Sequence, residues 1–167
     1  MLARAGWARS VGGVGPYLTL HARTGHSRET ADAAVAAMEI QELPAVRGCM
    51  YVVPASDYAL ALTLAAASGS SEMKLALKLG VTEKEVDALC DAVLAALKSG
   101  PAAPEEIRTA IGSKTRSLGP EGQKKGLTST LPLALERLQN SGHIRRLPTN
   151  GRLDRSATAT RCGSLIR

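Results

Sequence analysis

The chain has 167 residues, of which 44% are hydrophobic and 2% aromatic, with no Phe, one Trp and three Tyr. A chain of this size buries one moderate core or two small ones, and a core of Leu, Val, Ile, Met and Ala favours closely packed helices over a large aromatic-lined pocket. The net charge of +6 is uneven, because residues 1–107 carry 9 Lys or Arg against 12 Asp or Glu, whereas residues 108–167 carry 12 against 3.

The N-terminal segment MLARAGWARS is basic, but the glycines and Pro16 that follow interrupt any apolar run. A secretory signal peptide needs such a run directly after its basic residues. We therefore expect the protein to stay in the cytoplasm.

Residues 1–70 predict a partial or divergent winged-helix unit. Tyr17–Leu20 is typical of a short strand, and Ser27 is placed to cap a helix. The apolar face of that helix has three- and four-residue spacing and consists of Ala31, Ala34, Val35 and Met38.

Two β-prone runs, Ile40–Val46 and Cys49–Val53, lie on either side of an Arg-Gly pair and predict a β-hairpin. Arg47 would lie at this hairpin. Its position is consistent with an ordinary surface charge at a turn and equally with a phosphate contact.

An apolar run, Tyr58–Ala67, follows the hairpin, and Ser56 or Asp57 is placed to cap a helix there. The run is too short to cross a bilayer, so it predicts a buried helix and no membrane span.

Residues 71–155 predict a complete winged helix-turn-helix domain, which begins with a strong helix signal. Thr82 and Glu85 have the spacing of a capping box, and Gly100-Pro101 marks the end of the helix. The apolar stripe between these signals consists of Val86, Leu89, Cys90, Val93, Leu94 and Leu97.

Two further helices are expected. Pro104 suits the first residue of a short helix that ends before Gly112, with Glu105 and Glu106 at the positive end of its dipole. After a polar and basic stretch, residues 113–126, a third helix carries an apolar stripe and ends near Gly142, with Pro132 confined to its first turn. That stripe consists of Leu131, Ala134, Leu135 and Leu138.

A basic hairpin is expected after the third helix. His143–Leu147 predicts a strand, Asn150-Gly151 is typical of a tight turn, and Arg152-Leu153 begins the return strand. Residues 156–167 show little apolar periodicity and predict a disordered tail. The fold class is therefore mainly α-helical with short β-hairpins, arranged as tandem winged helix-turn-helix units.

Such a unit presents its third helix to the major groove of DNA and its wing to the phosphate backbone or the minor groove. A block as basic as residues 108–167 attracts a polyanion and favours binding through counterion release. We therefore predict binding to double-stranded DNA, mainly through phosphates. The alternatives are a solvated basic surface and a winged fold whose wing binds an acidic protein. The candidate DNA-binding residues are Arg47, Lys114, Arg116, Lys124, Lys125, Arg137, Arg145, Arg146, Arg152 and Arg155.

Four segments occur in the order of a known family: PYLTLHAR, VRGCMYVVPASD, AALKSGPAAPEEIRTAIG and LERLQNSGHIRRLPTNGRL. On these residues the chain resembles the bacterial winged-helix DNA-binding proteins that include the AlkZ/YcaQ-type DNA glycosylases, which unhook interstrand crosslinks. The match spans roughly residues 11–155. The resemblance implies several tandem winged helices around a DNA channel, with the Arg47 hairpin on the lesion side.

The chain departs from that family at the catalytic motif. A Gln-x-Gln or Gln-x-Asp motif precedes the segment that matches PYLTLHAR, and here that place reads VGGVG. Glycines cannot position or activate the attacking water, and Gln41 has no partner at the required spacing. We therefore assign no catalytic residue and favour a binding module over an enzyme. Glycosylase activity remains the alternative, and the sequence is typical of a truncated or degenerate member.

The remaining reactive side chains do not predict chemistry. The cysteines Cys49, Cys90 and Cys162 form no Cys-x-x-Cys pair, and the histidines show no metal-ligand spacing. Cys90 lies on an apolar stripe and is expected in the core. We expect no metal and no cofactor.

Overall fold

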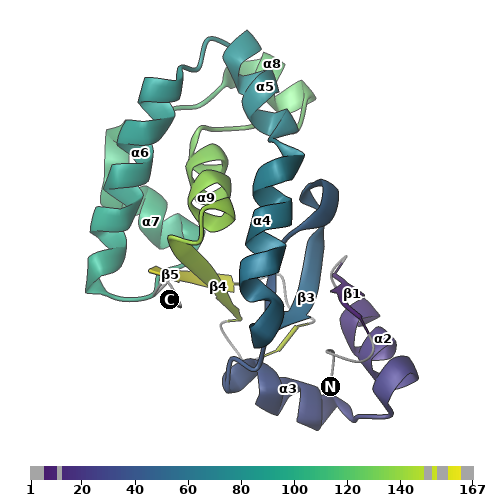
Figure 1. The fold of residues 1–167 in the computed structure, drawn as a ribbon. Helices are drawn as coiled ribbons and strands as arrows, with labels where there is room; N and C mark the ends of the chain where they lie inside the picture. Colours follow the sequence, from purple (N-terminus) through teal and green to yellow (C-terminus); the bar gives the residue numbers. More distant parts are fainter. Residues whose placement is uncertain (1–5, 11–12, 149–151, 154–157, 163–167) are drawn as a thin grey trace. The chain divides into compact units, whose positions relative to one another are not determined.

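The computed structural model describes residues 6–10, 13–148, 152–153 and 158–162 (Figure 1). The chain divides into two compact units. The first comprises Met1–Gly69 and Arg146–Ala159, and the second comprises Ser70–Arg145 and Thr160–Arg167. Within the described residues, no helix is both long and apolar enough to span a membrane.

The first unit contains a three-stranded sheet and helices on both of its faces. Its elements in chain order are β1 (Ala8–Arg9), α2 (Gly15–Thr24), α3 (Arg28–Ala36), β2 (Ile40–Pro44), η1 (Val46–Gly48), β3 (Met50–Pro54), η2 (Ala55–Asp57) and α4 (Tyr58–Ser68). The sheet has the order β1-β3-β2, and both pairings are antiparallel. The predicted hairpin is therefore confirmed, with Ile40 opposite Pro54 and Pro44 opposite Met50.

Successive residues of β3 point to opposite faces of this sheet. Val52 packs with Tyr17 and Leu20 of α2 and with side chains of α3, whereas Val53 packs with Tyr58 and other residues of α4. This is the alternation expected of a strand. The sheet is thus covered by α2 and α3 on one face and by α4 on the other.

The strand predicted at Tyr17–Leu20 is wrong, because these residues lie in helix α2. Pro16 stands in the first turn, where a fixed φ favours a helix, and Gly25 ends the helix with a left-handed φ of 69°. Tyr17 and Leu20 are three residues apart and share the buried face, which fits a helix, whereas a strand would place them on opposite faces.

The cap predicted for α3 is confirmed, since the Ser27 hydroxyl accepts a hydrogen bond from the Thr30 amide at 3.3 Å. The helix predicted from Tyr58 is present as α4, but it is buried only on the side of Tyr58, Ala61 and Ala65, so the expectation of a buried helix is wrong in part. Neither Ser56 nor Asp57 caps it. The Asp57 carboxylate instead accepts hydrogen bonds from the Trp7 indole at 2.8 Å and from the Ser56 hydroxyl at 3.0 Å.

The second unit is mainly helical. Its helices in chain order are α5 (Ser71–Lys78), α6 (Glu83–Ala96), η3 (Leu97–Ser99), α7 (Pro104–Ile111), η4 (Gly112–Lys114), α8 (Gly119–Lys124) and α9 (Leu131–Asn140). Strands β4 (Ile144–Pro148) and β5 (Thr158–Cys162) each cross the division between the units. One apolar core joins α6, α7 and α9 and includes Val86, Leu89, Ile107, Leu138 and Ile144.

The three predicted helices of this unit are confirmed as α6, α7 and α9. The Thr82 hydroxyl accepts from the Glu85 amide at 3.2 Å, and Pro104 begins α7. The Glu106 carboxylate accepts from the Ala103 amide at 2.6 Å, which satisfies one of the free amides at this helix start. Pro132 lies in the first turn of α9, as expected.

The polar and basic stretch, residues 113–126, contains helix α8, which the sequence analysis did not predict. Gly122 of α8 has the tightest surroundings, because an added Cβ would lie 2.4 Å from the Leu127 carbonyl oxygen and 2.5 Å from the Leu118 Cβ. A glycine is therefore required where this helix packs against the chain that follows it.

The predicted wing is correct in its first strand and wrong in its second. Strand β4 pairs with β5, whereas Arg152-Leu153 is not part of a strand. Leu153 is buried in the core of the first unit, and its amide donates to the Tyr17 hydroxyl at 2.8 Å. The Asn150-Gly151 turn lies outside the described residues. Part of the expected disordered tail, Thr158–Cys162, forms β5.

Both units have the strand connectivity of a winged helix. In the first unit the order along the chain is β1, α2, α3, β2, β3, and the sheet order is first, third, second strand. In the second unit Ala102 bridges Thr160 of β5, and β5 pairs with β4, which gives the same order. The expected tandem winged helix-turn-helix fold is therefore present.

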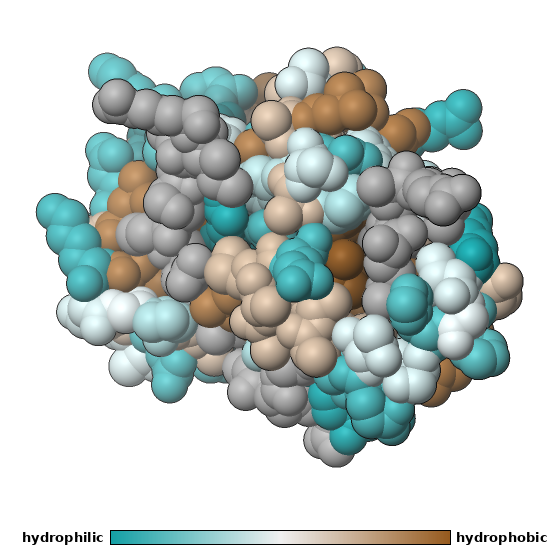
Figure 2. Space-filling model, turned by 60° about the horizontal axis from the view of Figure 1, so that its bottom comes forward, coloured by the Kyte–Doolittle hydropathy of each residue, from teal (hydrophilic) through white to brown (hydrophobic). Residues whose placement is uncertain are grey.

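Large apolar side chains are also exposed, namely Val14, Leu18, Val46, Leu60 and Leu77. Figure 2 shows one face of the molecule, on which hydrophobic and hydrophilic side chains are intermingled. Single exposed apolar residues are normal for a folded protein and need no further explanation.

Candidate nucleic-acid interface

The β2–β3 hairpin of the first unit corresponds to the wing of a winged helix, and Arg47 lies at its tip. The Cys49 amide donates to the Val46 carbonyl oxygen at 3.1 Å, closing a turn around Arg47 and Gly48. Both central residues have positive φ, 57° and 69°, which is the backbone of the tight turns that suit β-hairpins. The Arg47 amide donates to the Ser68 hydroxyl of α4 at 2.9 Å.

Arg47 is one of two non-glycine residues with positive φ among the described residues. A left-handed conformation costs an ordinary L-residue about 1–2 kcal/mol, and such strain gathers at functional sites. The side chain is exposed, and within the described chain it has no acidic partner. The hairpin therefore holds an unpaired guanidinium out from the wing at a cost to the backbone.

The second group of exposed cations lies in the segment that joins α7 to α9, residues 112–130. Lys114 and Lys125 are exposed, and no described acidic side chain pairs with either. Lys124 is exposed and forms an ion pair with Glu121 at 3.2 Å. An exposed pair of this kind is weak, so all three ammonium groups are available to a polyanion.

Arg116 and Arg137 are instead held by acidic residues of α6. The Arg116 guanidinium contacts both carboxylate oxygens of Glu85, at 2.6 and 3.3 Å, and the Gly80 carbonyl oxygen at 3.0 Å. Arg137 pairs with Glu83 and, at 2.6 Å, with Asp87. These arginines join the helices of the second unit in the free protein.

The described arginines of the wing of the second unit are buried or half-buried. Arg145 is only 5% exposed. The Arg146 guanidinium lies 3.9 Å from the Glu42 carboxylate and 3.8 Å from the Met50 sulfur. Arg152 is half-buried, and Arg155 lies outside the described residues. Their roles in DNA binding stay predictions.

Helix α9 is the third helix that the sequence assigned to the major groove. Of its residues only Pro132 is exposed, and Leu131, Leu133, Ala134 and Leu138 are buried. Its placement in the major groove stays a prediction. The exposed candidate cations lie at the wing tip and in the α7–α9 segment.

The segment VGGVG supplies no polar side chain. Gly13 has a φ of 60° and Gly15 begins α2, while Val11 and Gly12 lie outside the described residues. The residue before this segment, Ser10, is buried and donates from its hydroxyl to the Glu42 carboxylate at 2.5 Å. The Gln41 amide donates to the Met38 carbonyl oxygen at 3.3 Å.

The cysteine expected in the core is found there, since Cys90 is buried and its thiol lies 3.7 Å from the Ala134 carbonyl oxygen. Burial raises the pKa of the Cys90 thiol to about 11. The His21 ring contacts the His26 carbonyl oxygen. The His143 ring contacts the Ser141 hydroxyl. The part of the chain that is described contains no cluster of potential metal ligands.

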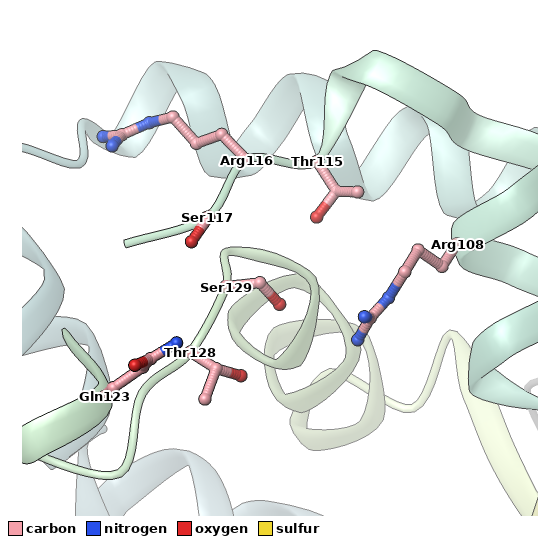
Figure 3. A pocket seen from close by; sticks show the side chains of 7 residues that line it. All are labelled: Arg108, Thr115, Arg116, Ser117, Gln123, Thr128 and Ser129. Atoms are coloured by element: carbon pink, nitrogen blue, oxygen red, sulfur yellow. The ribbon is translucent and has the colours of Figure 1, made fainter. Parts of the chain in front are cut away.

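A polar pocket in the second unit was not predicted from the sequence. It lies between the end of α7 and the start of α9, and its volume is about 310 Å³ (Figure 3). The sequence signal for this pocket is two hydroxyl-rich segments, one with Thr115 and Ser117 and the other with Thr128 and Ser129. Only folding brings these segments together with Arg108.

Comparison with known proteins agrees with this architecture. The family model described as DNA glycosylase AlkZ-like matches residues 14–164. Among solved structures, the Streptomyces sahachiroi DNA glycosylase AlkZ is similar, with a TM-score of 0.65 and 18% sequence identity. The similarity covers 96% of this chain and 42% of that chain. A search of curated proteins gave no match. The family model spans most of the chain, so the protein belongs to the AlkZ-like DNA glycosylase family.

Proposed function

We propose that the protein binds duplex DNA mainly through backbone phosphates. The observation that carries this proposal is the exposed guanidinium of Arg47 on a strained wing tip, without an acidic partner in the described chain. A wing that approaches a phosphate backbone is the usual arrangement for this fold. Family membership supports DNA as the ligand. The cellular setting would be cytoplasmic chromosomal DNA.

The exposed lysines of the α7–α9 segment provide a second contact surface. Lys114, Lys124 and Lys125 would neutralise phosphates and release counterions, as would Arg47. The ion-paired Arg116 and Arg137 contribute less, because an approaching phosphate must compete with carboxylates already in contact. Sequence selectivity would be low, since these contacts do not read base edges.

The test is a fluorescence-anisotropy titration with a labelled duplex at several salt concentrations. The expected result is binding that weakens linearly in log affinity against log salt, with similar slopes for unrelated sequences. The triple variant Lys114→Gln/Lys124→Gln/Lys125→Gln should lower the slope by about 2–3. An absence of binding at low salt would overturn the proposal and favour a protein partner.

A second candidate function is glycosylase activity, which family membership favours. Hydrolysis of an N-glycosidic bond needs a group that activates water, and VGGVG offers none. Glu42 is a carboxylate that contacts Ser10 directly before this segment. Base release from an alkylated duplex, measured for the wild type and for Glu42→Gln, decides between the two functions. Release that depends on Glu42 would establish an enzyme, and no release would leave a binding module.

A further inference from the structure

The pocket between α7 and α9 is built by two chain segments that are fixed against each other. Ser117 and Ser129 form an antiparallel bridge, and the Leu118 amide donates to the Thr128 carbonyl oxygen at 3.0 Å. On the other side of the bridge the Thr130 amide donates to the Arg116 carbonyl oxygen at 3.1 Å. Side chains on these segments are therefore held in place before any ligand arrives.

Two hydroxyl groups at the pocket lack hydrogen-bond partners. The hydroxyl oxygens of Thr115 and Ser129 are buried, and neither has a partner among the described residues. Ser129 as a whole is only 9% exposed. In Figure 3 both hydroxyls point into the pocket. Buried polar groups in proteins are normally satisfied by protein or by water, so these two hydroxyls can bind a water molecule or a ligand in the pocket.

The charge of the pocket restricts what that ligand is. The guanidinium of Arg108 points into the pocket toward Ser129 (Figure 3), and its ion pair with the exposed Glu105 is long, at 3.6 Å. Arg116 also lines the pocket, although its guanidinium is held by Glu85. None of the described lining residues is acidic. The lining therefore favours an anion over a cation.

The donor set matches a tetrahedral oxyanion. Hydroxyls and a guanidinium can all donate to oxygens that only accept, and such charge-assisted hydrogen bonds are the strong ones. The pocket volume of about 310 Å³ is enough for a phosphate group with its remaining hydration. We propose that this pocket binds a phosphate group through Arg108, Thr115 and Ser129.

The phosphate would come from the DNA backbone or from free phosphate in solution. The first source rests on the proposed function, whereas binding of inorganic phosphate does not. In the first case the pocket fixes the second unit on one strand, next to the lysines of the α7–α9 segment. In the second case it is an independent anion site.

The experiment uses the full chain and inorganic phosphate. Thermal stability is measured in sodium phosphate and in sodium chloride at equal ionic strength, because a ligand of the native state raises the melting temperature. The variants are Arg108→Gln and Ser129→Ala, and the matched controls outside the pocket are Lys98→Gln and Ser113→Ala. Ser129→Ala removes an unsatisfied hydroxyl, so it should fold at least as well as the wild type.

We expect phosphate to raise the melting temperature of the wild type and both controls. The affinity for phosphate should fall at least tenfold in Arg108→Gln and about fivefold in Ser129→Ala, the loss of a charged and a neutral donor. Equal responses in all five proteins, or no response in any, would overturn the phosphate pocket.

A duplex titration of the same five proteins separates this inference from the proposed function. Weaker DNA binding by the two pocket variants assigns the pocket to the DNA backbone. Unchanged DNA binding together with lost phosphate binding overturns the DNA source and leaves an anion site. Phosphate binding by a wild type that does not bind DNA overturns the proposed function and supports the pocket alone.

Discussion

The tip of the first wing allows the effects of charge and of backbone strain to be separated with substitutions at one position. Arg47 has a φ of 57° and a ψ of 29°, and its amide, which every substitution except proline keeps, donates to Ser68. Arg47→Gly removes both the guanidinium and the strain. Arg47→Ala removes only the guanidinium, and Arg47→Lys keeps a positive charge together with the strain.

The expected change in stability follows from the left-handed backbone. Glycine relieves about 1–2 kcal/mol of strain in the folded state, and its greater freedom in the unfolded chain costs about 0.4–1 kcal/mol. Arg47→Gly should therefore be more stable than the wild type by about 0.5–1 kcal/mol, or about 1–4 °C in melting temperature. Arg47→Ala and Arg47→Lys should stay close to the wild type.

The expected change in affinity follows from one phosphate contact. Losing it lowers the slope of log affinity against log salt by about 0.9, which corresponds to a loss of about eightfold at 0.1 M salt and about twofold at 0.4 M. Arg47→Gly and Arg47→Ala should show this loss equally, and Arg47→Lys should retain most of the affinity. Lys98→Gln, which removes an exposed charge in the second unit, controls for net charge.

Anisotropy titrations at four salt concentrations and thermal unfolding of the same samples supply both readouts. Arg47→Gly should have the highest melting temperature of the four proteins. Arg47→Gly and Arg47→Ala should share the lowest DNA affinity. Wild-type affinity and slope in Arg47→Gly would refute the phosphate contact. A lower melting temperature in Arg47→Gly would refute the account of the strained turn.

Three further predictions concern the packing of the second unit and its wing. Gly122→Ala should lower the unfolding free energy by about 1–3 kcal/mol in urea titrations, because the added Cβ would meet the backbone of Leu127. The control is Gly126→Ala, whose Cβ meets nothing within 4 Å, so it should cost only the strain of a φ of 78°, about 1 kcal/mol. Equal losses in the two variants would contradict this packing. The pKa of the Cys90 thiol is raised from 9.0 to about 11, so the contribution of the protonated thiol to stability is present below pH 9 and lost as the pH rises toward 11. A Cys90→Ala variant should lack this component of the pH dependence of urea unfolding. Identical pH profiles for the variant and the wild type would exclude a contribution from Cys90. Arg145→Ala should lower the melting temperature because the side chain is buried. The slope of log DNA affinity against log salt, measured on folded protein, should stay unchanged. A lower slope would place Arg145 at the DNA interface.

Local signals in the sequence determined helices α6, α7 and α9 of the second unit, whereas α5 and α8 were not predicted. The Thr82 hydroxyl and the Glu85 amide, which form the cap of α6, are three residues apart. Pro104 favours the start of α7 at its own position. The β2–β3 hairpin was also predictable, because its strands are separated by only a few residues. In each case the partners are so close along the chain that residue type and spacing decide the structure.

The tertiary structure alone decided which cations are available. Arg137 pairs with Asp87 across 50 residues and Arg116 with Glu85 across 31, and nothing in the sequence near either arginine indicates such partners. The return strand was predicted to begin at Arg152-Leu153, but β5 lies further along the chain. Its bridge joins Thr160 to Ala102, two residues that are far apart in the sequence. Charge in a sequence gives the sum over a segment, but a contact with a polyanion depends on which charges remain exposed and unpaired after packing. Arg47 meets that condition, and Arg145, buried by the fold, does not.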